Sequence, residues 1–294
     1  MDPTGLLVLD KPAGLTSHDV VARVRRLAGT RRVGHGGTLD PMATGVLIIG
    51  VGRATRLLTY VIGSGKAYSA TIRLGQSTIT DDAEGEVVAS VPADAVTDER
   101  IRAGLAVLTG EIAQVPSAVS AIKINGRRSY ARVRSGEQVS LAPRQVTVYR
   151  LDLLAVRRAE PGLVDLDVSV ECSSGTYVRA LARDLGAGLG VGGHLTALRR
   201  TAVGGFTLAE AVTLEQLAED PRARLVSLSD AAGRLLPRRD ASEEEARVLA
   251  HGGPLAGQGI EGPYAVFAPS GEVLAVVAER AGRARAEVVL SPAP

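Results

Sequence analysis

The chain has 294 residues and a formal net charge of +2, with 45% hydrophobic and 22% charged residues. This balance is typical of a globular protein with a sizeable core and excludes a chain that is disordered throughout. The single cysteine excludes an internal disulfide framework and a multi-cysteine zinc site. No apolar run is long enough to span a bilayer, and the first residues lack the basic region of a signal peptide, so we expect a soluble, cytoplasmic protein.

The charge is unevenly distributed along the chain. Residues 1–60 hold eight Lys and Arg against four acids, whereas residues 238–294 carry a net charge of −2. A basic N-terminal segment is compatible with a polyanionic partner such as nucleic acid. An ordinary solvated helix face would give the same local excess.

The predicted elements begin with a short buried strand over residues 5–12, ended by Pro12. A helix capped by Thr16 or Ser17 runs to about Ala28. The Gly-rich stretch 29–45 has no periodicity and is predicted to be a loop. Further strands are expected over 46–52, 66–75, 144–157, 162–172 and 194–204, and further helices over 54–61, 97–109, 175–190 and 243–252. Residues 115–136 are predicted to form a strand, an Asn125-Gly126 turn and a helix. A hairpin is expected over 264–279.

These elements mix helices and strands without a regular βαβ alternation. The pattern predicts an α+β protein with a mixed, mostly antiparallel sheet core and flanking helices. A polar, Pro-containing region lies near residues 220–240, and the clearest boundary falls near 225–240. We therefore expect a large domain over 1–230 and a small, mainly β C-terminal domain over 238–294.

The loop 29–45 is the most informative segment for chemistry. It holds five glycines, two adjacent arginines, one histidine and a single carboxylate, Asp40. Glycines let a ligand approach the backbone closely, and Pro41 restricts Asp40 to an extended conformation. The pattern fits a catalytic carboxylate, and it also fits an aspartate that only caps the loop through an Asx-turn.

Other common sites are not indicated. The phosphate-binding P-loop, the dinucleotide fingerprint and the nucleophile elbow are missing from the sequence. The four histidines lack metal-ligand spacing, so we expect no metal site.

Several motifs together resemble one enzyme family. The residues around Asp40 read His-x-Gly-x-Leu-Asp-Pro and then Ala-Thr-Gly over residues 35–45, after a Lys-Pro-x-Gly signature at 11–14. A tyrosine-bearing strand follows at 66–76, then Cys-Ser-x-Gly-Thr-Tyr-Val-Arg at 172–179, and a leucine-bearing segment at 192–204. In this order, from residue 5 to about 205, they resemble the TruB family of pseudouridine synthases, the bacterial tRNA pseudouridine-55 synthases.

The resemblance implies a fold of the pseudouridine synthase type and three catalytic residues. Asp40 is the implied nucleophile, Arg179 the partner that keeps its carboxylate charged, and Tyr68 the residue that assists loss of the uracil C5 proton. Taken alone, Arg179 also fits a surface helix arginine, and Tyr68 a core tyrosine.

The resemblance further implies three residues that bind the substrate. The target uridine must be flipped out of its loop, and His35 is the residue expected to occupy the vacated space. Tyr177 would pack under the base or position Arg179, at a strand-to-helix junction, and Leu198 would form an apolar pocket wall. Their ordinary alternatives are a loop histidine, a packing tyrosine and a core leucine.

The implied partner is tRNA, bound through its TΨC stem-loop, with no cofactor, no membrane and no obligate protein partner. Two basic runs, represented by Arg31, Arg32, Arg127 and Arg128, are expected to contact the RNA backbone. The terminal segment 238–294 resembles a PUA-type RNA-binding module in position, size and strand content, although its negative charge also suits a protein-packing role. Ile79 stands where the family usually has an acidic residue, so no role is carried over to that position.

Three other functions are compatible with parts of the pattern. An RNA-folding chaperone would not need Asp40 for its biological role, and it could accompany the enzyme activity. An RNA-guided synthase working in a complex is disfavoured by the short segment before Gly5 and the absence of long basic tails. A hydrolase would require a second placed carboxylate or a metal cluster, and the sequence shows neither.

Overall fold

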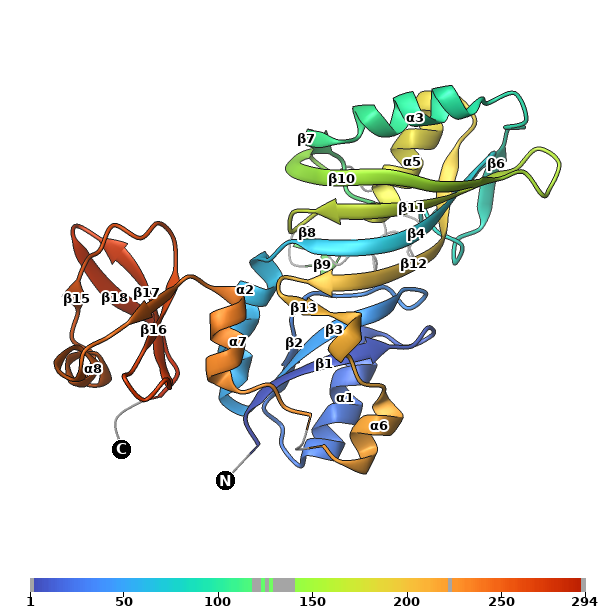
Figure 1. The fold of residues 1–294 in the computed structure, drawn as a ribbon. Helices are drawn as coiled ribbons and strands as arrows, with labels where there is room; N and C mark the ends of the chain where they lie inside the picture. The colour runs from blue at the N-terminus through green and yellow to red at the C-terminus, as the bar shows by residue number, and fades with distance from the viewer. Residues whose placement is uncertain (1–2, 118–122, 125–126, 129–140, 222–223, 292–294) are drawn as a thin grey trace. The chain divides into compact units, whose positions relative to one another are not determined.

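The computed structural model describes residues 3–117, 123–124, 127–128, 141–221 and 224–291 (Figure 1). The chain folds into two compact units. The first unit comprises Met1–Pro41, Gly45–Ser64 and Ala202–Pro294, and the second comprises Met42–Thr44 and Gly65–Thr201. Both units are therefore built from segments that are distant in the sequence.

The first unit begins with a small antiparallel sheet and one helix. Strand β1 (Gly5–Lys11) pairs with β3 (Thr44–Val51), and β2 (Val33–His35) pairs with the other edge of β3. Helix α1 (Ser17–Ala28) is capped by Thr16, one of the two predicted residues, and ends at Ala28 as predicted. Thr16 forms a capping box, and the C-cap residue Gly29 has a left-handed backbone. Strands β1 and β3 are apolar along nearly their whole length because both of their faces are buried.

The first unit is completed by short helices and a C-terminal sheet. The five strands of that sheet lie in the order β14-β16-β17-β18-β15, with β14 and β16 parallel and the other pairs antiparallel. The predicted hairpin over 264–279 forms its centre. The remaining elements are η1 (Gly52–Leu57), α2 (Leu58–Gly63), β13 (Phe206–Thr207), η2 (Leu208–Glu210), α6 (Leu214–Glu219), α7 (Leu228–Leu235), β14 (Arg238–Asp240), α8 (Glu243–Ala250), β15 (Leu255–Ala256), β16 (Tyr264–Phe267), β17 (Val273–Arg280) and β18 (Arg283–Val289).

Two sequence predictions are wrong in this unit. Residues 29–45 are not loop throughout, because Val33–His35 form β2; three residues among glycines are too short to give a periodic signal. The polar region 220–240 contains α7, which Ser227 caps and which buries only Ala231 and Ala232. The apolar residues Leu228, Ala231, Ala232 and Leu235 recur at helical spacing, so the sequence does carry a signal for this short helix.

The C-terminal sheet shares its core with the N-terminal strands of the same unit. Phe267 and Leu290 belong to one buried cluster with Val8, Ile48 and Leu57. Arg53 and Arg56 donate hydrogen bonds to the carbonyls of Leu290 and Val289, at 3.2 and 2.5 Å. The last sixty residues are thus part of the folded core rather than a loosely attached appendage.

We expect Phe267→Ala to lower the free energy of unfolding by about 3–5 kcal/mol, because it leaves a cavity in this shared core. Urea unfolding followed by circular dichroism measures the change. Val248→Ala, at a position 40% exposed on α8, is the control and should cost no more than about 0.5 kcal/mol. A loss below about 1 kcal/mol for Phe267→Ala would contradict a shared core.

The second unit is a twisted sheet with helices on one face (Figure 1). Strands β4 (Lys66–Leu74), β11 (Val164–Cys172), β10 (Arg144–Arg157) and β7 (Gly110–Gln114) pair antiparallel in that order, and β12 (Gly193–Val203) flanks β4. Alternate residues of β4 and β11 are buried, and α5 (Val178–Leu189) packs on β4 while α3 (Asp98–Val107) packs on β10 and α5. The predicted α+β class with mixed, mostly antiparallel sheets is confirmed.

Short strands complete the second unit. Strand β5 (Gln76–Thr78) pairs with β6 (Val87–Ser90), and β8 (Lys123–Ile124) pairs with β9 (Arg127–Arg128). The Asn125-Gly126 turn and the helix predicted after it lie outside the described residues. Within the described ranges, no helix is long and apolar enough to cross a membrane.

Candidate active site

The residues on both sides of Asp40 are anchored through their backbone atoms. The hydroxyl of Ser17 accepts from the Leu39 N–H at 2.9 Å and donates to the Leu39 carbonyl at 3.1 Å. The Pro41 carbonyl accepts from the Gly14 N–H at 2.8 Å and from Lys11 Nζ at 3.2 Å. Asp40 lies between these two anchored residues and is half-buried. Its backbone is therefore held in place within the first unit.

The buried side chain of Lys11 supports this loop through hydrogen bonds to backbone carbonyls. The side chain is fully buried, and Nζ also donates to the carbonyls of Pro12 at 2.9 Å and Leu15 at 2.7 Å. Three carbonyl oxygens match the three donors of an ammonium group and replace its lost water. The Lys-Pro signature of the sequence is therefore part of the support for Asp40.

His35 lies five residues before Asp40, at the end of β2. Gly36 follows it, and a Cβ there would come within 2.4 Å of Val61 Cγ1, so only glycine lets the chain pass this close to α2. The His35 ring meets the His18 ring of α1 edge to face, with centroids 5.3 Å apart. The ring is thus oriented by the first helix.

In the second unit, Arg179 forms a buried ion pair. Its Nη1 lies 3.2 Å from Asp82 Oδ2, the two side chains being only 5% and 3% exposed, and it donates to the Thr80 carbonyl at 2.8 Å. Asp82 Oδ1 accepts from Thr80 Oγ1 at 2.5 Å and from the Glu84 N–H at 3.1 Å. The turn after β5 therefore fixes the guanidinium.

Asp82 is not among the catalytic or binding residues predicted from the sequence. Its neighbour Asp81 has a left-handed backbone, with a φ of 60°, and contacts Arg183 Nη1 at 3.3 Å. Burial raises the pKa of Asp81, and the nearby Arg183 guanidinium opposes that rise. Two carboxylates and two arginines thus tie this turn to α5.

The other predicted residues of this unit sit where the sequence suggested. Tyr68 is on the buried face of β4, and Leu198 is buried on β12. Tyr177 is the N-cap residue of α5, with an extended φ of −103°, directly after the turn that follows β11. The expected strand-to-helix junction before Arg179 is confirmed.

Lys66 shares the face of β4 that carries Tyr68, one pleat away. Burial, together with the nearby Arg200 guanidinium, lowers the pKa of its amine to about 8. Because the unfolded amine keeps its ordinary value near 10.5, the unfolded state binds more protons between pH 8 and 10.5, and stability from this group rises with pH there.

We therefore expect Lys66→Met to be more stable than wild type at pH 7, with the difference becoming smaller as the pH rises from about 8 to 10.5, because the buried amine of the folded wild type is then neutral. Urea unfolding at pH 7 and at the upper end of this range tests this. Lys66→Arg, which stays charged throughout, should show no such gain. A difference between Lys66→Met and wild type that does not change with pH would contradict the assignment.

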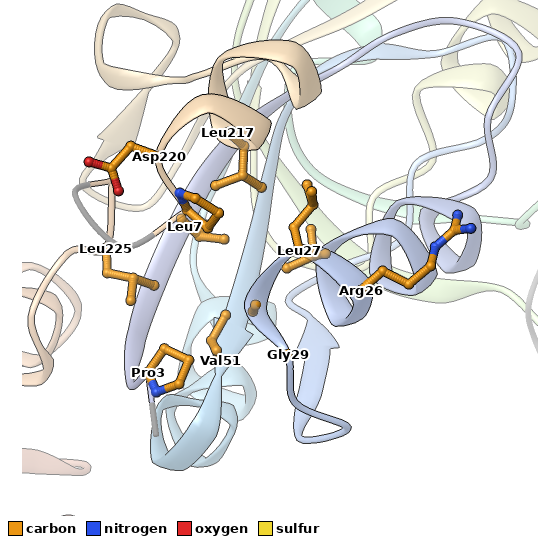
Figure 2. Close-up of a pocket in the computed structure, with 12 residues that line it drawn as sticks. Pro3, Leu7, Arg26, Leu27, Gly29, Val51, Leu217, Asp220 and Leu225 are labelled. Atoms are coloured by element: carbon orange, nitrogen blue, oxygen red, sulfur yellow. The ribbon is translucent and has the colours of Figure 1, made fainter. Parts of the chain in front are cut away.

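One pocket of the first unit has a volume of about 380 Å³ (Figure 2). Its walls are mostly apolar and come from β1, the end of α1 and α6, with Arg26 and Asp220 as charged lining residues. None of the predicted site residues lines it, so it is not part of the candidate active site.

Arg31 and Arg32 are exposed between α1 and β2, and Arg127 and Arg128 form β9. Among the described residues, no group of three or more His, Cys, Asp or Glu is placed to hold a metal ion. The first unit thus carries His35 and Asp40, and the second carries Tyr68, Tyr177, Arg179 and Leu198.

The α+β fold, together with the sequence around the anchored Asp40 loop, is that of a pseudouridine synthase. Residues 25–178 match the family model of the TruB family pseudouridylate synthase N-terminal domain. Residues 179–225 match the tRNA pseudouridylate synthase B C-terminal domain, and residues 236–291 match the C-terminal domain of tRNA pseudouridine synthase II. The chain belongs to the TruB family.

Known relatives and solved structures agree with this membership. The tRNA pseudouridine synthase B of Arthrobacter sp. (strain FB24) is 60% identical, over 98% of this chain and 97% of the relative. That of Rhodococcus jostii (strain RHA1) is also 60% identical, over 98% and 94%. A crystal structure of a Cbf5-Nop10-Gar1 complex is similar over 98% of this chain and 85% of the other, with a TM-score of 0.75 and 26% identity.

Proposed function

We propose that this tRNA pseudouridine synthase converts uridine 55 in the TΨC loop of tRNA to pseudouridine, with Asp40 as the nucleophile. Family membership and the relatives named tRNA pseudouridine synthase B support the reaction and the substrate class. The site assignment depends on one observation, the anchoring of Asp40. Its neighbouring residues Leu39 and Pro41 are held by Ser17, Gly14 and Lys11. We further propose cytoplasmic action, where tRNA is available, without an obligate protein partner.

The reaction defines what the residues must do. The bond between N1 and C1′ breaks, a bond between C5 and C1′ forms, the C5 proton leaves and N1 gains a proton, so no electron donor or acceptor is consumed. Asp40 supplies the nucleophilic carboxylate, which must be ionised, and the guanidinium of Arg179 favours that charged form. The buried pair with Asp82 supports this role because it holds the guanidinium in one orientation.

The flipped base needs walls and a base for its proton. We assign Tyr68 to the C5 proton, Tyr177 to packing under the base and Leu198 to the apolar wall, in line with their positions on β4, at the start of α5 and on β12. His35 fills the space that the uridine leaves. Its ring orientation against His18 supports this role.

Binding to the stem-loop would rest on phosphate contacts. We assign Arg31, Arg32, Arg127 and Arg128 to the RNA backbone, since guanidinium groups pair with phosphates without reading sequence. A catalytic domain over 1–230 and a PUA-like C-terminal domain over 238–294 remain the proposed functional division of the chain. Strands β14 to β18 and helix α8 fall within residues 238–294.

Release of tritium from unmodified tRNA transcript labelled at uridine C5 tests the proposal. Wild-type protein, without added cofactor or metal, should release one tritium per transcript, and a transcript with cytidine at position 55 should release none. Binding of the transcript without any release would contradict the enzyme assignment and favour the RNA-folding chaperone.

A further inference from the structure

Gln114 makes two hydrogen bonds to a single residue 63 positions away. Its Oε1 accepts from the Tyr177 N–H at 2.8 Å, and its Nε2 donates to the Tyr177 carbonyl at 3.1 Å. The residue is 2% exposed and is the last of β7, where its backbone pairs with Arg144 of β10. The side chain amide therefore joins the sheet of the second unit to the backbone at the start of α5.

This contact takes the part that the N3 side chain has in a capping box, where that side chain accepts from the N–H of the N-cap residue. Tyr177 is the N-cap residue of α5, and its own side chain forms no capping hydrogen bond. The Tyr177 carbonyl already accepts the first hydrogen bond of the helix, from the Leu181 N–H at 3.2 Å, so Gln114 uses its second lone pair. Both polar atoms of the Tyr177 backbone are thus satisfied, and the entry direction of the helix is fixed by the sheet.

The rest of α5 is held by other contacts. Leu181, Leu185 and Leu189 are buried in the second unit, and the Arg183 side chain donates to the Val115 carbonyl at 2.7 Å, one residue after Gln114. Loss of the Gln114 amide would therefore leave the helix in place while freeing its first turn. That turn carries Tyr177 and, two residues later, Arg179.

We propose that Gln114 is a positioning residue for the reaction, which sets the placement of Tyr177 and Arg179 through the Tyr177 backbone without contacting the substrate itself. The inference rests on the proposed function. Misplacement of a reacting group by about 1 Å costs on the order of 100-fold in rate. Removal of the amide should therefore affect the chemical step more than RNA binding.

The experiment compares Gln114→Ala and Gln114→Glu with wild type. Glutamate keeps the size and the acceptor, but when ionised it cannot donate to the Tyr177 carbonyl. We expect single-turnover tritium release to slow by about 10- to 100-fold in both variants, while the Kd for the tRNA transcript changes less than about threefold. Hydrogen exchange over residues 173–181 should become faster, because the Tyr177 N–H loses its acceptor or its rigid setting.

Gln145→Glu is the matched control. It is the same chemical change at an exposed position of β10, next to the residue that pairs with Gln114, and it should leave the rate unchanged. Wild-type rates in the Gln114 variants would overturn the inference, as would a rate loss matched by an equal loss of tRNA affinity or of folded protein. Absence of tritium release by wild type would instead contradict the proposed function.

Discussion

Asp40→Asn is expected to abolish isomerisation while leaving tRNA binding intact. Asparagine has the same size as aspartate but is not a nucleophile under these conditions, and loss of a nucleophile costs at least about four orders of magnitude in rate. The loop should keep its shape, because its anchors at the backbone of Leu39 and Pro41 are unchanged by the substitution. Single-turnover tritium release and a filter-binding Kd measure the two quantities.

A matched control is available on the surface. Asp240 has a side chain that is 68% exposed, and Asp240→Asn should retain wild-type turnover. The nucleophile assignment would be refuted by an Asp40→Asn enzyme that turns over within tenfold of wild type. A variant that binds no tRNA would show that the carboxylate also supports the RNA-binding surface.

The second large effect is expected from the ion pair between Arg179 and Asp82. Asp82→Asn removes the carboxylate that is paired with the buried guanidinium of Arg179, and breaking such a pair by removing one partner typically costs about 3–5 kcal/mol in the free energy of unfolding. The same change frees the guanidinium to reorient, so we expect the isomerisation rate to fall on the order of 100-fold. Urea unfolding and single-turnover release measure the two effects.

A double variant separates stability from catalysis. Arg179→Met combined with Asp82→Asn removes both charges, while the introduced amide keeps an oxygen for the Glu84 N–H, so stability should recover relative to Asp82→Asn alone. Activity should not recover, because no guanidinium remains to support the nucleophile. Recovery of both properties would show that Arg179 serves only the fold.

The periodic elements could be predicted from sequence because each reports its own surroundings. The alternation of β4 and β11 and the apolar stripe of α1 reflect burial of a face, and the structure confirms them. The Gly-rich setting of Asp40 likewise carries a local signal. Strand β2 has only three residues and therefore gives too little periodicity, whereas helix α7 has apolar residues at helical spacing and could have been predicted.

The partners of the site residues could not be predicted in the same way. Asp82 and Arg179 are 97 positions apart, and Gln114 and Tyr177 are 63 apart, so only the folded sheet brings them together. Nothing in the sequence indicates that the side chain of a glutamine at a strand end will bind the backbone at the start of a helix. The aspartate of a polar turn also reads as an ordinary turn residue.

The discontinuous make-up of the first unit has a consequence for synthesis on the ribosome. Strands β1 and β3, with the Asp40 loop between them, are complete by residue 51, but they share their core with Phe267 and Leu290. At about 5–20 residues per second, the missing part emerges on the order of ten seconds or more later. The nascent strands must remain uncovered until translation is nearly finished, so an interrupted transcript would yield an aggregation-prone fragment rather than a smaller working enzyme.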